Sequence, residues 1–308
     1  MNDPDALKGR GADQSVGFEN FKLKIMSIKT YKPTSKSRRQ MSVVSYKSVL
    51  SKTKKHKSLV FGRNRKVGRD NAGRISVRHK GGGAKRLWRE VDFKYDKINI
   101  PYKIVSVEYD PNRSGLIGLA VYRDGEKRYA LLPRGVKAGQ ELLTAENAPL
   151  IPGNRLQLKN IPIGTFVYNV EVKPKGGAKL ARSAGNYIQV LAKDLGMVDL
   201  KMPSSEVRRV SENAWGSIGE VSNEEKRLEV FGKAGRSRWK GIRPTVRGTA
   251  MNPVDHPHGG GEGRQGRGRR RAVSAWGRPT GKGQKSRRAK KYSDKFIVSR
   301  RKVGKQRG

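Results

Sequence analysis

The 308-residue sequence contains no cysteine and only 26 acidic residues. The absence of cysteine excludes disulfide bonds and thiolate zinc sites, so packing or a binding partner must stabilise the fold. No apolar run approaches the roughly 20 residues that a membrane-spanning helix needs. Residues 116–121 are among the longest such runs, and they are only six residues long. We therefore expect no membrane partner.

Lysine and arginine are as abundant as acidic residues are scarce. They number 69 and give a formal net charge of +43 at pH 7. This excess goes far beyond what solubility requires and indicates a polyanionic partner, with nucleic acid the best fit. The N-terminus has no basic segment followed by an apolar core, and it carries Asp3, Asp5 and Asp13. Because this pattern is unlike a secretory signal or a transit peptide, we expect a cytoplasmic location.

The charge divides the chain into four segments. Residues 1–25 balance four basic residues against four acidic ones, and residues 90–231 carry 21 basic and 18 acidic residues. By contrast, residues 26–89 hold 20 basic residues and one acidic residue, and residues 232–308 hold 24 and three. These two flanking extensions are rich in Gly, Ser, Lys and Arg and poor in aliphatic residues, so they cannot bury a core of their own. We expect them to be disordered in isolation and to order on a polyanion.

The nearly neutral middle of the chain has the pattern of a mostly β fold. Short apolar runs alternate with Gly, Pro, Asn and Asp, and Asp124-Gly125 is a hairpin signal between two of them. Strands this short over 142 residues favour two small barrels packed side by side over one large sandwich. The expected strands are residues 104–109, 116–122, 128–132, 155–158, 165–173, 186–192, 197–202 and 206–210.

Residues 251–271, MNPVDHPHGGGEGRQGRGRRR, hold the residue types of several kinds of chemistry. Residues 261–266 match GxGxxG, but a dinucleotide site needs a strand before this motif and a helix after it. Asp255, His256 and His258 could ligate a metal, yet the chain has only four histidines and offers no clear further ligand. Asp255 could also orient His256 as a general base, but no motif places a nucleophile beside it. We therefore predict no metal, no cofactor and no catalytic residue.

Glycine runs and tryptophans in the extensions have two interpretations each. Residues 81–83 and 259–261 could be flexible linkers, or they could let backbone N–H groups face phosphates. Trp215 lies in the middle segment and is expected in the core. Trp239 and Trp276 lie where no core is expected, so they could stack on bases or sugars beside Arg238 and Arg278.

One long motif resembles a known family. Residues 246–264, VRGTAMNPVDHPHGGGEGR, are similar to the signature of the universal ribosomal protein two of the large subunit, in its bacterial type. The resemblance extends in order from Met26 to the C-terminus. The further similar blocks are residues 29–40, 73–83, 91–94 (VDFK), 108–114 (EYDPNRS), 131–135, 180–190 (LARSAGNYIQV), 232–250 and 293–301.

The resemblance implies a fold and a set of partners. It implies an oligonucleotide-binding-type barrel at residues 90–152 and an SH3-like barrel at residues 153–231. A basic extension at residues 26–89 would thread into rRNA, and another at residues 232–308 would reach toward the peptidyl-transferase region. The implied function is that of a primary rRNA-binding protein that supports subunit association, tRNA binding and peptide-bond formation by RNA. Its expected partners are large-subunit rRNA, the small subunit at an intersubunit bridge, nearby tRNA and neighbouring ribosomal proteins.

The same resemblance implies contact residues. By motif, Arg113, Arg182 and, less directly, Lys94 would contact rRNA. His256 is interpreted as a residue that positions RNA rather than as a catalyst. The remaining expected rRNA-binding residues are Arg238, Trp239, Arg243, Arg247 and Arg264, and the expected loop near the peptidyl-transferase region comprises Asn252, Asp255, His256, His258, Gly259, Gly260 and Gly261.

Two departures and two rival functions complete the sequence-based picture. Residues 265–272 are more arginine-rich than the family pattern, and residues 1–25 resemble nothing in it. We hypothesise that translation begins at Met26; a lineage-specific tail is the alternative. The rival functions are a general nucleic-acid-compacting protein, which would bind any duplex similarly, and an enzyme acting on RNA. The enzyme would need paired carboxylates or a nucleophile, whereas the C-terminal extension has only Asp255, Glu262 and Asp294 as acidic residues.

Overall fold

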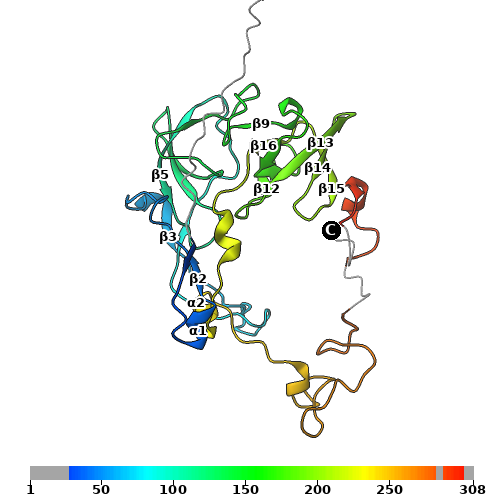
Figure 1. Ribbon diagram of the computed structural model, residues 1–308. Coiled ribbons are helices and arrows are strands. Elements are labelled where there is room, and N and C mark those ends of the chain that lie inside the picture. Colours follow the sequence, from blue (N-terminus) through cyan, green and yellow to red (C-terminus); the bar gives the residue numbers. More distant parts are fainter. Residues whose placement is uncertain (1–27, 282–286, 302–308) are drawn as a thin grey trace, which may run out of the picture.

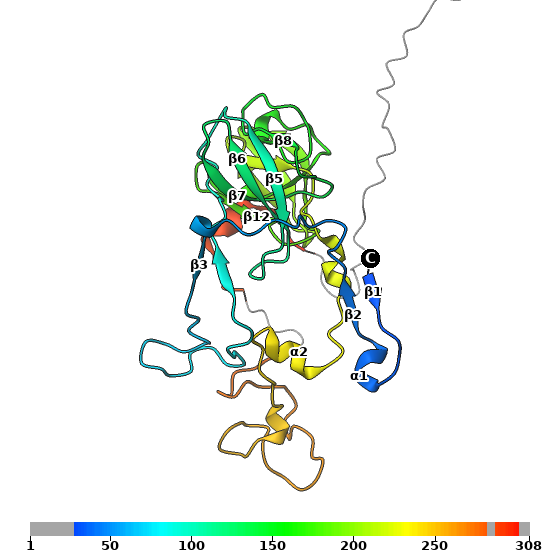
Figure 2. The same ribbon diagram turned by 90° about the vertical axis from the view of Figure 1, so that its left-hand side faces the viewer.

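A computed structural model describes residues 28–281 and 287–301 of the chain. The hypothesis that translation begins at Met26 concerns residues outside these ranges. Two β bodies lie side by side, and long extensions lie on one side of them (Figures 1 and 2). In both views, the part of the C-terminal extension around residues 248–271 lies farthest from the β bodies. Among the described residues, no helix combines the length and apolarity needed to cross a membrane.

The first β body is an antiparallel sheet with the strand order β7-β6-β5-β8. Side chains of β5 alternate between buried Tyr102 and Ile104 and exposed Lys103 and Val105, as a sheet with one face on a core requires. The predicted hairpin forms, with the N–H of Gly125 donating to Tyr122 O (2.9 Å). The strands are β5 (Tyr102–Glu108), β6 (Ile117–Tyr122), β7 (Lys127–Leu131) and β8 (Glu141–Leu142).

The second β body is a seven-stranded antiparallel sheet with the order β17-β15-β14-β13-β10-β16-β9. Its edge strand β17 comes from the C-terminal extension, which therefore returns to the barrel after leaving it. The strands of the sheet are β9 (Arg155–Gln157), β10 (Phe166–Tyr168), β13 (Ile188–Asp194), β14 (Met197–Lys201), β15 (Val207–Ser211), β16 (Trp215–Ile218) and β17 (Ile297–Ser299). A separate small ribbon pairs β11 (Val170–Glu171) with β12 (Ala178–Leu180).

Each β body has its own hydrophobic core. One core contains Ile104 and Leu132, and the other contains Val167 and Leu200. A third, small cluster of Leu131, Tyr168 and Val221 joins the two bodies. The prediction of a mostly β fold is confirmed, and the arrangement is consistent with an oligonucleotide-binding-type barrel followed by an SH3-like barrel. Trp215 is 8% exposed, which confirms its expected place in the core.

The extensions contain short elements that contact the barrels and each other. Val44 of β2 belongs to the core of the first body, so part of the N-terminal extension packs as barrel structure. Ser42 exchanges hydrogen bonds with Leu228 and Val230, just before the start of the C-terminal extension. The helices and strands here are β1 (Ile28–Thr30), α1 (Lys36–Arg39), β2 (Ser42–Val44), β3 (Val60–Gly62), β4 (Leu87–Arg89) and α2 (Ala234–Trp239). The 3-10 helices of the chain are η1 (Lys57–Leu59), η2 (Leu158–Asn160), η3 (Glu224–Leu228), η4 (Gly248–Ala250) and η5 (Tyr292–Phe296).

Candidate nucleic-acid interface

The structure brings together three expected rRNA-binding residues that lie far apart in the sequence. The guanidinium carbons of Arg113 and Arg182 lie 5.3 Å and 4.4 Å from the centre of the Phe93 ring. Lys94 follows Phe93 in the chain and is exposed. Arg113 belongs to the first body and Arg182 to the second, so this cluster, which we call the junction site, spans both barrels.

Backbone contacts hold the junction site together. The N–H of Ala178 donates to Phe93 O (2.8 Å), and the N–H of Ala184 donates to Ser114 Oγ (3.0 Å). Gly177 has a φ of +72°, and a Cβ added there would lie 3.0 Å from Phe93 O. A larger residue would be strained and would push the two segments apart. The glycine at this position therefore lets the second barrel approach the residues beside Lys94.

The arginines of the junction site differ in their electrostatic surroundings. Asp110, whose side chain is fully buried, accepts a hydrogen bond from Arg113 Nε at 2.6 Å and lies 3.7 Å from Arg89. In contrast, neither Arg182 nor Lys94 forms a salt bridge within the part of the chain that the structure describes. In the junction site, Arg182 and Lys94 are therefore cations without a carboxylate partner, whereas the charge of Arg113 is neutralised by Asp110. Uncompensated cations of this kind suit phosphate groups.

A second meeting point joins the two extensions to each other. The N–H groups of Gly81 and Ala84 donate to Gly241 O and Trp239 O, both at 2.8 Å. A Cβ added to Gly83 would lie 2.5 Å from Trp239 O. The glycine run at 81–83 therefore forms a close backbone contact with the end of α2, and it is not a free linker as one interpretation held. We call this contact the extension interlock.

Expected contact residues surround the extension interlock. Arg243 is tied to it because its N–H donates to His79 O at 3.1 Å, while its side chain is exposed. Arg238 lies in the last turn of α2. Arg247 and Arg264 are exposed further along the extension. These residues keep their charges at the surface around a fixed backbone, which is what a phosphate-binding surface requires.

The two tryptophans expected outside any core are indeed exposed. Trp239 is 58% and Trp276 is 74% exposed. The Lys233 ammonium lies 4.9 Å from the ring centre of Trp239, and the Arg78 guanidinium lies 4.8 Å from that of Trp276. Each ring therefore has a cation at its face and still offers surface on which a base or sugar could stack.

The expected loop near the peptidyl-transferase region is a compact turn. The N–H groups of Asp255 and His256 both donate to Asn252 O, at 3.0 and 3.2 Å. The N–H of Gly259 donates to His256 O (2.8 Å). A Cβ added to Gly259 would collide with Asn252 O. Glycine is therefore required here for packing within the loop, and the loop holds its own shape.

Three further glycines fit the loop to its surroundings. A Cβ added to Gly248 would lie 2.5 Å from the His256 ring. Gly260 has a φ of +79°, and a Cβ there would lie 2.6 Å from Pro253 Cγ. Gly261 has a φ of +92° and is exposed. The run 259–261 is thus built for a tight turn, and it is not an unstructured linker.

The two histidines of the loop accept hydrogen bonds from the backbone. The N–H of His258 donates to His256 Nδ1 at 3.0 Å, and the N–H of Val273 donates to His258 Nε2 at 3.1 Å. The rings lie 4.7 Å apart, centre to centre. Burial, together with the charges of His256, Arg267 and Arg269, lowers the pKa of His258. His258 is therefore neutral at pH 7, with its proton on Nδ1.

These hydrogen bonds bear on the metal and general-base interpretations. The His256 Nδ1 atom, which an orienting carboxylate would hold, accepts a backbone N–H instead of bonding to Asp255. Residues 28–281 and 287–301 contain no cluster of three or more acidic or histidine side chains that could hold a metal. Asp255 is exposed at the loop surface. The loop geometry thus suits recognition by shape and hydrogen bonding.

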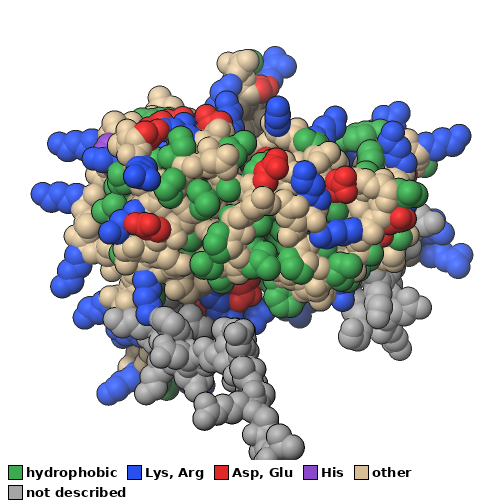
Figure 3. Space-filling view, turned by 90° about the horizontal axis from the view of Figure 1, so that it is seen from above, with side chains coloured by type: hydrophobic (Ala, Val, Ile, Leu, Met, Phe, Trp, Pro, Cys, Tyr) green, Lys and Arg blue, Asp and Glu red, His purple; other side chains and the backbone are tan. Residues whose placement is uncertain are grey.

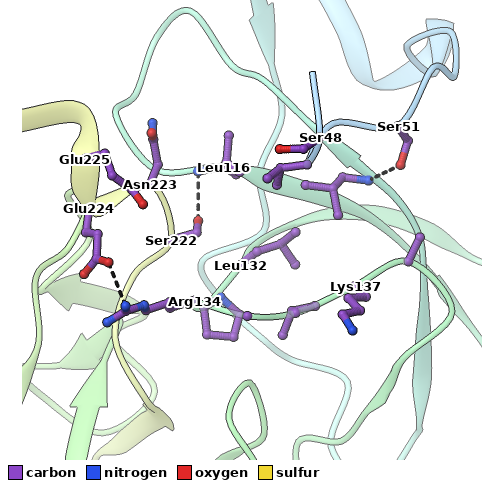
Figure 4. A pocket seen from close by; sticks show the side chains of 16 residues that line it. Ser48, Ser51, Leu116, Leu132, Arg134, Lys137, Ser222, Asn223, Glu224 and Glu225 are labelled. Atoms are coloured by element: carbon purple, nitrogen blue, oxygen red, sulfur yellow. Dashed lines mark hydrogen bonds and ion pairs between the residues drawn. The ribbon is translucent and has the colours of Figure 1, made fainter. Parts of the chain in front are cut away.

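One cavity lies apart from all the expected contact residues. It has a volume of about 520 Å³ and lies between residues 48–51, the first body and residues 222–225 (Figure 4). Ser222 Oγ accepts the N–H of Leu116, and Arg134 forms a salt bridge with Glu224 at 2.8 Å. The polar side chains around the cavity thus connect segments of the protein to each other. We therefore interpret the cavity as a gap between packed segments and not as a ligand site.

Sequence reasoning missed several residues that shape the interface. Phe93 was not among the expected contact residues, although it is an aromatic residue beside Lys94 in the VDFK motif. Arg86 connects three parts of the molecule, because it donates to Pro111 O (3.1 Å) and to Lys240 O (3.3 Å). Trp88 of β4 carries the Arg63 guanidinium at 4.9 Å. The spacing of these residues in the sequence does not indicate which residues they contact.

Comparison with known families gives two matches that together span most of the chain. Residues 56–144 match the RNA-binding N-terminal domain of ribosomal proteins L2. Residues 151–277 match the C-terminal domain of ribosomal proteins L2. The first match covers the N-terminal half of the junction site, and the second covers Arg182, α2 and the histidine loop. With both domains present in order, the chain belongs to the ribosomal protein L2 family, whose members are RNA-binding proteins of the large ribosomal subunit.

Proposed function

We propose that this chain is a primary rRNA-binding protein, that its junction site and extensions contact rRNA phosphates, and that it supports subunit association and tRNA binding. The observation that carries the proposal is the arrangement of charge. Both cationic extensions lie on one side of two nearly neutral barrels (Figures 1 and 2), and they are joined there by the extension interlock. A crowded polyanion is the partner that such a surface fits.

The mechanism is electrostatic and geometric. The barrels recognise folded rRNA by its shape, and the extensions neutralise phosphates where RNA helices crowd together. Exposed Trp239 and Trp276 supply stacking surfaces. Arg182, Arg243, Arg247 and the neighbouring arginines supply charge-assisted hydrogen bonds to phosphates. Binding to isolated rRNA therefore weakens steeply as salt rises.

The histidine loop has a separate part in the proposal. It approaches the peptidyl-transferase region and positions RNA there, while the RNA performs the chemistry. Its distance from the barrels in the structure (Figures 1 and 2) and the glycines that fix its shape support this placement. Exposed Asn252 and Asp255 and the partly exposed His256 are the side chains available for contacts. The neighbouring proteins and the small subunit would meet the remaining barrel surface.

Reconstituted large subunits test the proposal. Subunits are assembled with the unaltered chain, with Arg182→Ala or with His256→Ala, and the protein content of salt-washed particles is measured. Arg182→Ala lowers incorporation at elevated salt, whereas His256→Ala is incorporated normally but slows tRNA binding and peptide-bond formation. Equal rates for the His256→Ala and unaltered particles would reject the role of the loop. Unchanged incorporation of Arg182→Ala across the salt range would reject the contact at the junction site.

Small-subunit association gives an independent readout. Light scattering on mixing with small subunits measures it directly, and we expect slower association for particles that lack this protein than for complete particles. Restoring the protein restores the rate. Association that is indifferent to the presence of the protein would remove the intersubunit part of the proposal and leave rRNA binding standing.

A further inference from the structure

The junction site contains an aromatic side chain whose ring lies against two guanidinium groups. Phe93 meets Arg182 at 4.4 Å and Arg113 at 5.3 Å, measured from the guanidinium carbon to the ring centre. The same ring packs on the small cluster of Leu131, Tyr168 and Val221 that joins the barrels. Phe93 is thus anchored on one side by apolar packing and meets two cations elsewhere.

The two arginines on this ring are not equivalent. Arg113 forms a salt bridge with buried Asp110 and has a side chain that is only 16% exposed. Arg182 is exposed, and its one hydrogen bond among the described residues runs from Nη1 to Ala178 O at 3.3 Å. Most N–H groups of Arg182 therefore remain available, whereas the charge of Arg113 is neutralised by a carboxylate within the protein.

We propose that Phe93 is a positioning residue for RNA binding: its ring holds the Arg182 guanidinium in place to grip a phosphate, while Arg113, fixed by Asp110, completes the site as a structural neighbour. The inference rests on the proposed contact between Arg182 and rRNA. It goes beyond that contact because it assigns different roles to the two arginines and gives a role to Phe93.

The physical reason lies in the cost of ordering a long side chain. A free arginine loses rotamer entropy when its long side chain is fixed in one geometry. A guanidinium that already lies over an aromatic face and is tied to Ala178 O has lost part of that freedom before RNA arrives. Stacking uses the face of the guanidinium and leaves N–H groups at its edge for a phosphate.

Charge balance favours this division of roles. Two unpaired guanidinium groups on one ring would repel each other, but Asp110 neutralises Arg113. Asp92, one residue before Phe93, does not cancel Arg182, because its carboxylate bonds to Arg128 and to the N–H groups of Lys94 and Tyr95. The net positive charge of the site is therefore concentrated on Arg182 and its neighbour Lys94.

The test is a double-mutant cycle on the full chain. The variants are Phe93→Leu, Arg182→Lys and the pair, and the probe is an in vitro transcript of large-subunit rRNA titrated at several salt concentrations. A cation–aromatic contact at an exposed site contributes about 0.5–1 kcal/mol, so we expect each single variant to bind roughly two- to fivefold more weakly. The pair is then no weaker than either single variant, since both remove one and the same contact.

The salt dependence separates positioning from direct contact. Phe93→Leu keeps every charge, so the slope of log affinity against log salt stays unchanged, whereas Arg182→Ala lowers that slope by about one. Phe93→Tyr keeps the ring and serves as the matched control, with affinity close to that of the unaltered chain. Thermal unfolding followed by circular dichroism shows whether each variant folds.

Each outcome bears on one proposal. Additive losses in the cycle, or a Phe93→Tyr chain as weak as Phe93→Leu, overturn the positioning role of Phe93 while leaving the Arg182 contact intact. An Arg182→Ala chain with unchanged affinity and slope overturns the contact itself. If Phe93→Leu unfolds, the rRNA affinity of Arg182→Lys tests the stacking contact instead, because this substitution is at an exposed residue and keeps the charge. Affinity unchanged in Arg182→Lys would overturn the stacking argument.

Discussion

The barrels and the extensions differ in the partners of their cations. In the barrels, arginines meet carboxylates: Arg134 pairs with Glu220 and Glu224, and Arg155 pairs with Glu171. Seen from above, the barrel surface shows acidic and apolar side chains between the basic ones (Figure 3). In the extensions, cations instead lie over rings or donate to backbone carbonyls, as Arg78 does over Trp276 and Arg65 does to Ala84 O.

This difference indicates how each region obtains its stability. A barrel that neutralises its own charges and buries its own core can fold without a partner. An extension with far more cations than carboxylates carries self-repulsion that an external anion relieves. Exceptions occur where an extension meets the barrel segment. Arg89 pairs with Asp110, and Arg236 and Lys240 pair with Glu229. Arg287 and Arg300 pair with Asp294 just where the chain returns to the barrel as β17.

The largest effect is expected inside the second barrel. Arg155 and Glu171 have side chains that are 1% and 2% exposed, with Arg155 also donating to Asn169 O at 2.7 Å. Arg155→Leu leaves the buried Glu171 carboxylate without its partner and costs about 3–5 kcal/mol of unfolding free energy. Urea denaturation of the full chain measures the loss.

A surface pair in the same sheet is the control. Arg209 and Asp199 have side chains that are 45% and 19% exposed. Arg209→Leu should change the free energy of unfolding by no more than about 0.5 kcal/mol. If both substitutions cost the same, the barrel does not depend on internally neutralised charge, and the contrast with the extensions fails.

A smaller effect is expected at the extension interlock. Gly83 has a φ of +61°, and a Cβ there would meet Trp239 O at 2.5 Å. Gly83→Ala therefore adds roughly 1–2 kcal/mol of backbone strain and should weaken rRNA binding about tenfold, because the two extensions no longer lock together. Filter binding to large-subunit rRNA measures the change.

The neighbouring glycine provides a matched control. A Cβ on Gly82 would meet nothing within 4 Å. Gly82→Ala should bind rRNA like the unaltered chain, and neither variant should alter the unfolding of the barrels. A Gly82→Ala chain as weak as Gly83→Ala would show that the run needs flexibility, and the interlock would lose its role.

The junction site, where barrel and extension behaviour meet, predicts different effects for its two arginines. Arg182→Ala should lower the slope of log affinity against log salt by about one. Arg113→Ala should lower it less, and should instead destabilise the first barrel by about 1–3 kcal/mol, because buried Asp110 loses its closest cation. The sequence analysis named both arginines as rRNA contacts, which by itself would give equal slope changes. Equal changes in slope with no loss of stability would restore that expectation and reject the division of roles.

Much of the fold was predictable because it depends on local patterns. The predicted strands at residues 104–109, 116–122 and 197–202 match β5, β6 and β14 to within two residues, since alternation and turn residues are local signals. β16 was not predicted, because Trp215–Ile218 is buried throughout and lacks alternation. The return of residues 297–299 to the second barrel was also missed, since pairing with β15 across about 90 residues leaves no trace in a charge count.

The candidate site was predictable as a set of residues but not as an arrangement. Arg113 and Arg182 were named from separate motifs, whereas their shared contact with Phe93 depends on how the two barrels pack. Composition made the glycine run at 81–83 look like a linker or a phosphate cradle. The structure shows that this glycine run contacts the end of α2 and so joins the two extensions. Such long-range partners follow from tertiary structure.

The smallest effect concerns the histidine loop, the part of the extensions that is ordered by its own hydrogen bonds. Burial lowers the pKa of His258, so the folded loop binds the proton less well than the unfolded chain does. The stability that neutral His258 contributes is therefore present above the ordinary value of 6.5 and is lost as pH falls through the lowered pKa. Protonation also ends the acceptance of the Val273 N–H by Nε2.

NMR titration of the histidine rings should show His258 titrating below 6.5 together with a shift of the Val273 amide, and His258→Gln should remove the coupled shift. A Val273 amide indifferent to pH would mean that the hydrogen bond from the Val273 N–H to His258 does not hold the loop in solution.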